Sequence, residues 1–174
     1  MVSCRQMISL HGCRLAERGG QGSVTYLPQY LMELPRVNGE TDIFLLEKRI
    51  KDSFVHFSNN VGVINIDVDA ELVHAFSHWT FVASEGRVMV TDLQGAKKGN
   101  NYTLTDPTVH CSIDLARFNA TNLGTPGMEA FFCSHECGPT CTILGLGIHD
   151  SQALLNETDM DSLGGDCNDW IVFD

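Results

Sequence analysis

Four of the seven cysteines and two of the seven histidines lie within residues 110–141 of this 174-residue sequence. His135, Cys137 and Cys141 follow one another at His-x-Cys-x-x-x-Cys spacing, and His110 lies upstream. Tetrahedral zinc is held by four nitrogen or sulfur donors, and a site with four protein ligands leaves no position open for substrate. These four residues therefore predict a structural zinc site that ties the segment around His110 to the C-terminal half of the chain.

Other interpretations of the same cluster remain open. The histidines and thiols could be unrelated, with buried free cysteines beside solvated imidazoles, and Cys111 or Cys133 could replace a neighbouring ligand. A thiol nucleophile formed by His110 and Cys111 is disfavoured, because adjacent residues of an extended strand point to opposite faces. The odd count of seven cysteines and their crowding favour a metal over disulfides in a reducing compartment.

Two aspartates form a second candidate site. Asp92 ends the apolar stretch that contains Val88 and Val90, and Asp106 ends the extended stretch 102–104. Carboxylates at the ends of neighbouring strands suit a site for a metal ion and phosphate groups. Taken singly, each aspartate is better explained as an ordinary surface residue, and only its place at the end of an apolar stretch favours a function.

The elements that must position these residues can be read from periodicity. A helix is predicted from Asp69, as N-cap, to a left-handed cap at Gly86. Its buried face is spaced i, i+3, i+4, i+7 and consists of Leu72, Ala75, Phe76 and Trp79. The other expected elements are a strand at 24–34, a short helix at 44–50, extended structure at 53–67, strands at 88–90 and 102–104 separated by a loop at 97–100, and a helix at 127–134.

Composition bounds the class of protein. A hydrophobic content of 43% with 19% charged residues is enough for one packed core. The net charge of −11 repels phosphate backbones and anionic lipid, so nucleic acid and membranes are not expected as partners. The first residues lack the apolar core of a secretory signal, and a cytoplasmic location is expected.

Four motifs, in the same order and at similar spacing, resemble those of the alpha-kinase family, an atypical branch of protein kinases. They are Ala75-Phe-Ser-His-Trp-Thr-Phe81, Val90-Thr-Asp-Leu-Gln-Gly95, Leu104-Thr-Asp-Pro-Thr-Val-His110 and the His-x-Cys-x-x-x-Cys run that begins at His135. The resemblance covers roughly residues 24–146, about the second half of that domain.

The resemblance implies roles for single residues. Asp92 is similar to the catalytic aspartate that orients the accepting hydroxyl, and Gln94 and Asp106 are similar to the ligands of the magnesium ion that holds ATP. The implied zinc ligands are His110, His135, Cys137 and Cys141. Asn122 and Gly124 match part of a glycine-rich loop that serves substrate binding.

The sequence also departs from the family pattern. His56 stands where the family has a lysine, and no lysine precedes Lys48, whereas the family's phosphate-binding lysine lies well before that point. Loss of an electrostatic stabiliser of this kind costs about two or more orders of magnitude in rate. The nucleotide-binding lobe is therefore expected to be absent or strongly reduced.

Together these features predict an α+β domain, the C-terminal lobe of an atypical protein kinase with a structural zinc site. The expected organisation is a linker or lobe remnant at 1–23, the kinase portion at 24–147 and an acidic tail at 148–174. The expected activity is ATP-dependent phosphorylation of a protein serine or threonine, with Zn²⁺ as scaffold and Mg²⁺ and ATP at the active site. The alternative is a zinc-stabilised pseudokinase or truncated fragment that binds a protein partner without phosphotransfer.

Overall fold

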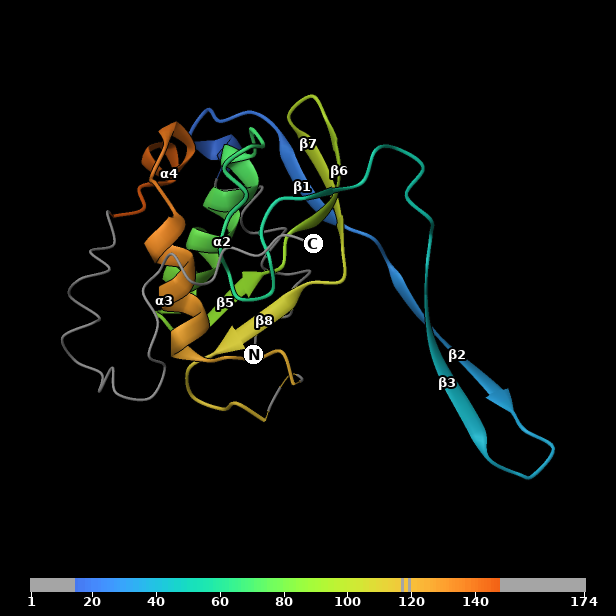
Figure 1. The fold of residues 1–174 in the computed structure, drawn as a ribbon. Coiled ribbons are helices and arrows are strands. Elements are labelled where there is room, and N and C mark those ends of the chain that lie inside the picture. Colours follow the sequence, from blue (N-terminus) through green and yellow to red (C-terminus); the bar gives the residue numbers. More distant parts are fainter. Residues whose placement is uncertain (1–14, 117, 119, 148–174) are drawn as a thin grey trace.

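Four short strands form the sheet that carries one half of the candidate site (Figure 1). In spatial order they are β1 (Ser23–Tyr26), β7 (Asn101–Thr105), β6 (Gln94–Lys98) and β4 (Val55–His56). β1 runs parallel to β7, and the other two pairings are antiparallel. β5 (Val88–Thr91) and β8 (Thr108–Cys111) form a separate antiparallel pair. The structure, a computed structural model, describes residues 15–116, 118 and 120–147.

Helix α2 (Glu71–Ala83) is the central helix, as its apolar periodicity predicts. Every residue from Leu72 to Thr80 is buried, because the helix is covered on several sides and not on one face alone. The prediction that Asp69 is its N-cap is wrong. Ala70 holds that position without a side-chain cap, and the Asp69 carboxylate lies 3.1 Å from Lys97 Nζ.

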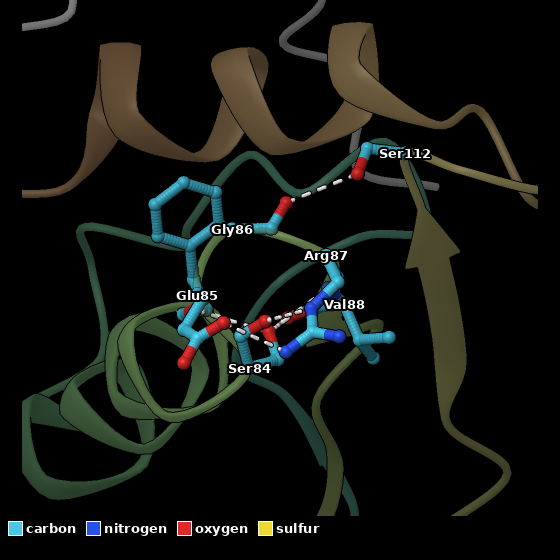
Figure 2. A network of polar contacts seen from close by, with 7 residues as sticks. Ser84, Glu85, Gly86, Arg87, Val88 and Ser112 are labelled. Atoms are coloured by element: carbon cyan, nitrogen blue, oxygen red, sulfur yellow. Dashed lines mark hydrogen bonds and ion pairs between the residues drawn. The ribbon is translucent and has the colours of Figure 1, made fainter. Parts of the chain in front are cut away.

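The turn that follows α2 fixes the direction of β5 (Figure 2). Gly86 N–H donates to the carbonyl of Phe81 and Glu85 N–H to that of Val82, which is the paired bonding of a Schellman motif. Glu85 (φ 56°) and Gly86 (φ 76°) are both left-handed, so the predicted cap extends over two residues. Ser84 Oγ then accepts from Val88 N–H at 2.9 Å, which joins the helix end to the strand.

Two further helices cover the body of the domain, α3 (Thr125–Ser134), which was predicted, and α4 (Pro139–Leu144), which was not. The larger core cluster joins α2 with the strands and α4, through residues such as Phe57, Phe76 and Leu104. A smaller cluster joins β5 to α3 and consists of Met89, Met128, Phe131 and Phe132.

A two-stranded hairpin, β2 (Gln29–Pro35) and β3 (Thr41–Glu47), projects away from this body (Figure 1). The predictions of one strand over 24–34 and a helix over 44–50 are therefore wrong. Leu27 and Pro28 separate β1 from β2, and the apolar run 43–46 is extended. The register puts Tyr30, Met32, Phe44 and Leu46 on one face of the hairpin and Leu31 and Leu45 on the other. Leu31 and Leu45 are 63% and 67% exposed.

The expected loop at 97–100 and the expected terminal segments can be compared with the structure only in part. The loop expected at 97–100 is the tight end of the β6–β7 hairpin, with Gly99 left-handed at φ 58°. Leu15, within the expected linker, is 2% exposed and belongs to the larger core. Residues 1–14 and the expected tail at 148–174 lie outside the described residues. Among the helices of the described part, none has both the length and the apolar character needed to cross a bilayer.

Candidate functional site

Asp92 and Asp106 stand at the ends of β5 and β7, each in a left-handed backbone conformation. Their φ angles are 52° and 44°, and Glu85 is the only other non-glycine residue with positive φ in the described part of the chain. Such conformations cost about 1–3 kcal/mol each and cluster at active sites, where the surrounding structure enforces them.

Gln94, the first residue of β6, joins the two aspartates. Its Nε2 lies 3.3 Å from Asp92 Oδ2 and 3.4 Å from the backbone carbonyl of Asp106. Burial raises the pKa of Asp92, His56 opposes that shift, and the charge of Asp106 adds to it. The structure thus brings the three sequence-predicted residues together in a site where negative charge is unfavourable without a cation.

The backbone around Asp92 is held by two neighbours. Asp92 N–H donates to the carbonyl of Asn59 at 3.2 Å, and the Asn59 side chain closes its own turn by accepting from Val63 N–H at 3.0 Å. Gly95 follows Gln94 with φ 150°, and a Cβ there would lie 2.1 Å from the carbonyl oxygen of Thr103. Only glycine lets β6 approach β7 this closely.

Two further residues, which the sequence analysis did not connect with the two aspartates, lie at the border of this site. His56 is the register partner of Gln94 across β4 and β6. The Glu47 carboxylate accepts from the hydroxyl of Thr105, the residue before Asp106, and from Gln29 Nε2 at 2.7 Å. The base of the projecting hairpin is thereby fixed beside Asp106.

A second cluster gathers His78, His135, Cys137 and Cys141, whose ligand atoms all lie within 4.8 Å of one another. His78 comes from α2, His135 follows α3, and Cys141 lies in α4. His78 Nδ1 lies 3.6 Å from Cys137 Sγ and 3.7 Å from Cys141 Sγ. His135 Nε2 lies 3.8 Å and 3.4 Å from the same two sulfurs.

These spacings fit tetrahedral zinc. Bonds of about 2.3 Å to sulfur and about 2.05 Å to nitrogen at the tetrahedral angle put N and S about 3.5 Å apart. Burial lowers the pKa of His135 to about 3, so its ring is neutral, and raises the pKa of Cys141 to about 12. A buried thiol of this kind needs a metal to become a thiolate.

His110 is not part of this cluster, contrary to the sequence prediction. The fourth donor is His78, on the central helix, and neither Cys111 nor Cys133 replaces a ligand. The cluster therefore ties α2, and not the strand around His110, to the segment that joins α3 and α4. His78 lies on the predicted helix next to residues spaced for burial, and a buried imidazole requires polar partners, but His110 adjoins an apolar stretch as well, so this signal does not choose between them.

Glu71, in the first turn of α2, anchors the cluster from outside. Its carboxylate accepts from the backbone N–H of Thr140 and, at 2.7 Å, from the Thr140 hydroxyl. Thr140 lies in the first turn of α4, next to Cys141, so the carboxylate satisfies one of the helix-end N–H groups that lack a partner within the helix. A Cβ at Gly138 would lie 2.6 Å from Glu71 Oε1, so glycine keeps the approach open.

The loop that contains Asn122 and Gly124 is held from within. Asn122 Oδ1 accepts from the N–H groups of Cys111 and Gly124, and Nδ2 donates to the carbonyls of Asp114 and Leu115. The side chain of Asn122 therefore shapes the loop and has no donor left for a ligand. Gly124 takes φ 63° at the start of α3.

Comparisons with known proteins agree with this architecture. The model of the alpha-kinase family matches residues 4–141. The alpha-protein kinase vwkA of Dictyostelium discoideum is 41% identical over 105 residues, which are 60% of this chain and 17% of that protein. Elongation factor 2 kinase of Rattus norvegicus is 34% identical over 127 residues, which are 73% of this chain and 17% of that protein.

Solved structures agree as well. An alpha kinase from Entamoeba histolytica matches with a TM-score of 0.70 and 28% identity, over 85% of this chain and 61% of that one. The alpha-kinase domain of myosin-II heavy chain kinase A in complex with AMP-PNP matches with a TM-score of 0.69 and 26% identity, over 84% and 53%. The chain thus spans a small part of the curated relatives and little more than half of the solved chains.

Proposed function

The chain belongs to the alpha-kinase family, and we propose that it transfers the γ-phosphate of ATP to a serine or threonine hydroxyl of a protein. The observation that carries the proposal is the convergence of Asp92 and Asp106, both in left-handed conformations, on the amide of Gln94. A strained backbone at two carboxylates of one site is typical of a reaction centre. The complex of myosin-II heavy chain kinase A with AMP-PNP supports a nucleotide ligand.

The roles follow from the chemistry of the groups. Asp92 would accept a hydrogen bond from the substrate hydroxyl and orient it, while the carboxylate of Asp106 and the amide oxygen of Gln94 would hold magnesium. Magnesium would supply neutralising charge to the phosphate oxygens. The raised pKa of Asp92, caused first by burial and also by Asp106, fits a site that a cation completes. His56, beside Gln94, adds an imidazole to the border of the same site.

The test is transfer of labelled γ-phosphate from MgATP to a basic threonine peptide. Asp92→Ala and Asp106→Ala are expected to abolish incorporation, whereas Glu136→Ala, an exposed carboxylate outside the site, keeps it. MgATP affinity separates the roles, because Asp106→Ala should weaken it strongly and Asp92→Ala should not. If the wild-type protein binds a partner protein but neither binds MgATP nor transfers phosphate, the pseudokinase alternative replaces this proposal.

We also propose that His78, His135, Cys137 and Cys141 hold one structural zinc ion. The closed set of four donors leaves no coordination position for substrate. Two thiolates neutralise the charge of the ion, so the buried site carries no net charge when loaded. Thiols that must stay reduced suit a reducing compartment, and we propose the cytoplasm on that ground.

Elemental analysis tests the ligand set. Wild-type protein and His110→Asn should both contain about one zinc per chain, whereas His78→Ala should contain less than about half. Because His78 is buried and its variant could misfold, Cys137→Ser is the second test, since Cys137 is exposed. Zinc retained in both ligand variants, or lost in His110→Asn, would refute the assignment.

A further inference from the structure

His110 is completely buried, and the metal cluster does not use it. Its Nδ1 lies 3.1 Å from the backbone N of Leu123, and its Nε2 lies 3.2 Å from Thr91 Oγ1. The backbone of Asn60 and of Val61 partly opposes the effect of burial on the pKa of this ring. One imidazole therefore joins three segments that are distant in the sequence.

The two ring nitrogens have different functions. A backbone N–H can only donate, so Nδ1 accepts from Leu123 and the proton of the neutral ring is on Nε2. Burial lowers the pKa of His110 to about 4, so the ring is neutral at physiological pH. The ring is held by the hydroxyl of Thr91 and the backbone N–H of Leu123, and neither residue has a charged side chain.

Each nitrogen is directed to a different part of the candidate site. On the Nε2 side, Thr91 immediately precedes Asp92, whose N–H donates to the carbonyl of Asn59. On the Nδ1 side, Leu123 lies between Asn122 and Gly124. The ring packs directly against Gly127 of α3, where a Cβ would lie 2.5 Å from Nε2, so only glycine at that position leaves room for it.

We propose that His110 is a positioning residue that holds the backbone of Asp92 and the 122–124 loop in a fixed relation. The proposal rests on the proposed function, which takes Asp92 as the catalytic residue and the loop as part of the peptide site. Asp92 keeps its left-handed conformation only while its neighbours enforce it. His110 supplies that constraint through its contact with Thr91, and the same ring orients the loop through its contact with Leu123.

Two substitutions separate the two contacts. His110→Asn keeps an acceptor near the position of Nδ1 and loses the donor, and His110→Gln keeps a donor near Nε2 and loses the acceptor. In peptide phosphorylation, His110→Asn should lower kcat by about 10- to 100-fold with little change in KM, because a misplaced catalytic group costs this much. His110→Gln should raise KM for the peptide and leave kcat close to that of the wild type.

Amide hydrogen exchange gives a second readout that does not depend on activity. His110→Asn should speed exchange at Asp92, and His110→Gln should speed exchange at Leu123. Thr91→Val removes a partner of Nε2 alone and should behave as His110→Asn does. Ser112→Ala is the control. Ser112 directly follows β8 and its hydroxyl donates to the carbonyl of Gly86, so its removal should change exchange at neither amide.

The outcomes are distinct. Equal changes in kcat and KM in both variants, or faster exchange at the same amides in both, would mean that the ring only fills space and would overturn the proposal. The expected exchange pattern in a protein that transfers no phosphate would uphold the link between the two segments and refute the proposed catalytic function.

Discussion

Replacing Glu71 by alanine should destabilise the domain through α4. The carboxylate accepts two hydrogen bonds from Thr140, one from the backbone and one from the hydroxyl. Hydrogen bonds to charged groups contribute about 1.5–3 kcal/mol each, but these two share one carboxylate and one partner residue and do not add fully. The loss of a helix cap alone costs about 0.5–2 kcal/mol. The expected loss for Glu71→Ala is therefore about 2 kcal/mol, and about 1 kcal/mol for Glu71→Gln, which keeps an acceptor.

Urea unfolding measures this loss. A slope of about 1–3 kcal/mol per molar converts 2 kcal/mol into a midpoint lower by about 1 M. Glu136→Ala is the matched control, because it removes the same charge from an exposed position in the same segment. Thr140→Val removes only the hydroxyl partner, so the double variant with Glu71→Ala should lose less than the sum of the single losses. A midpoint for Glu71→Ala equal to that of Glu136→Ala, or full additivity in the double variant, would refute the anchoring of α4 by Glu71.

Two other predictions concern burial. The unfolded chain binds more protons at His110 than the folded chain between pH 6.5 and 4, because burial lowers the folded pKa to about 4. The free energy of unfolding should therefore decrease as the pH is lowered through that window, and His110 accounts for about 2 kcal/mol of this decrease between pH 8 and pH 5. A urea midpoint with the same pH dependence in His110→Gln would contradict this prediction. Leu104→Ala, at a side chain with 0% exposure, should cost about 2–5 kcal/mol. Leu45→Ala, on the projecting hairpin, should change stability by no more than about 0.5 kcal/mol in the same assay, and comparable losses would mean that the hairpin face is covered.

The parts of the fold that the sequence predicted have strong local signals. α2 has an apolar spacing that continues for about two turns, and β5 is a short apolar run that ends just before Asp92. The hairpin β2–β3 was missed because four consecutive apolar residues, 43–46, fit a buried helix or a strand equally well. Only pairing with β2 decides between them, and that partner lies ten or more residues away along the chain.

The candidate site divides in the same way. Asp92 and Asp106 could be grouped because each ends an extended stretch, and Gln94 was added by the resemblance to the alpha-kinase family. The sequence alone could not show that the three residues meet, because Asp92 follows β5 and the other two belong to the β6–β7 hairpin. The choice between His78 and His110 was beyond the sequence, because both histidines adjoin apolar stretches and both are buried. What separates them is the packing of α2 against the segment between α3 and α4, which depends on tertiary contacts such as that of Glu71 with Thr140.

Because the His/Cys cluster contains His78, and not the predicted His110, one helix connects this cluster to the candidate reaction site. On one side of α2, Ser77 Oγ donates to the carbonyl of Val90 at 2.6 Å, and Thr80 Oγ1 accepts from Val90 N–H at 3.0 Å. Val90 lies two residues before Asp92. The next residue of the helix after Ser77 is His78, which faces Cys137 and Cys141. Because Ser77 and His78 share one turn of a rigid helix, a metal bound at His78 would also fix the strand that presents Asp92, although the two sites share no ligand.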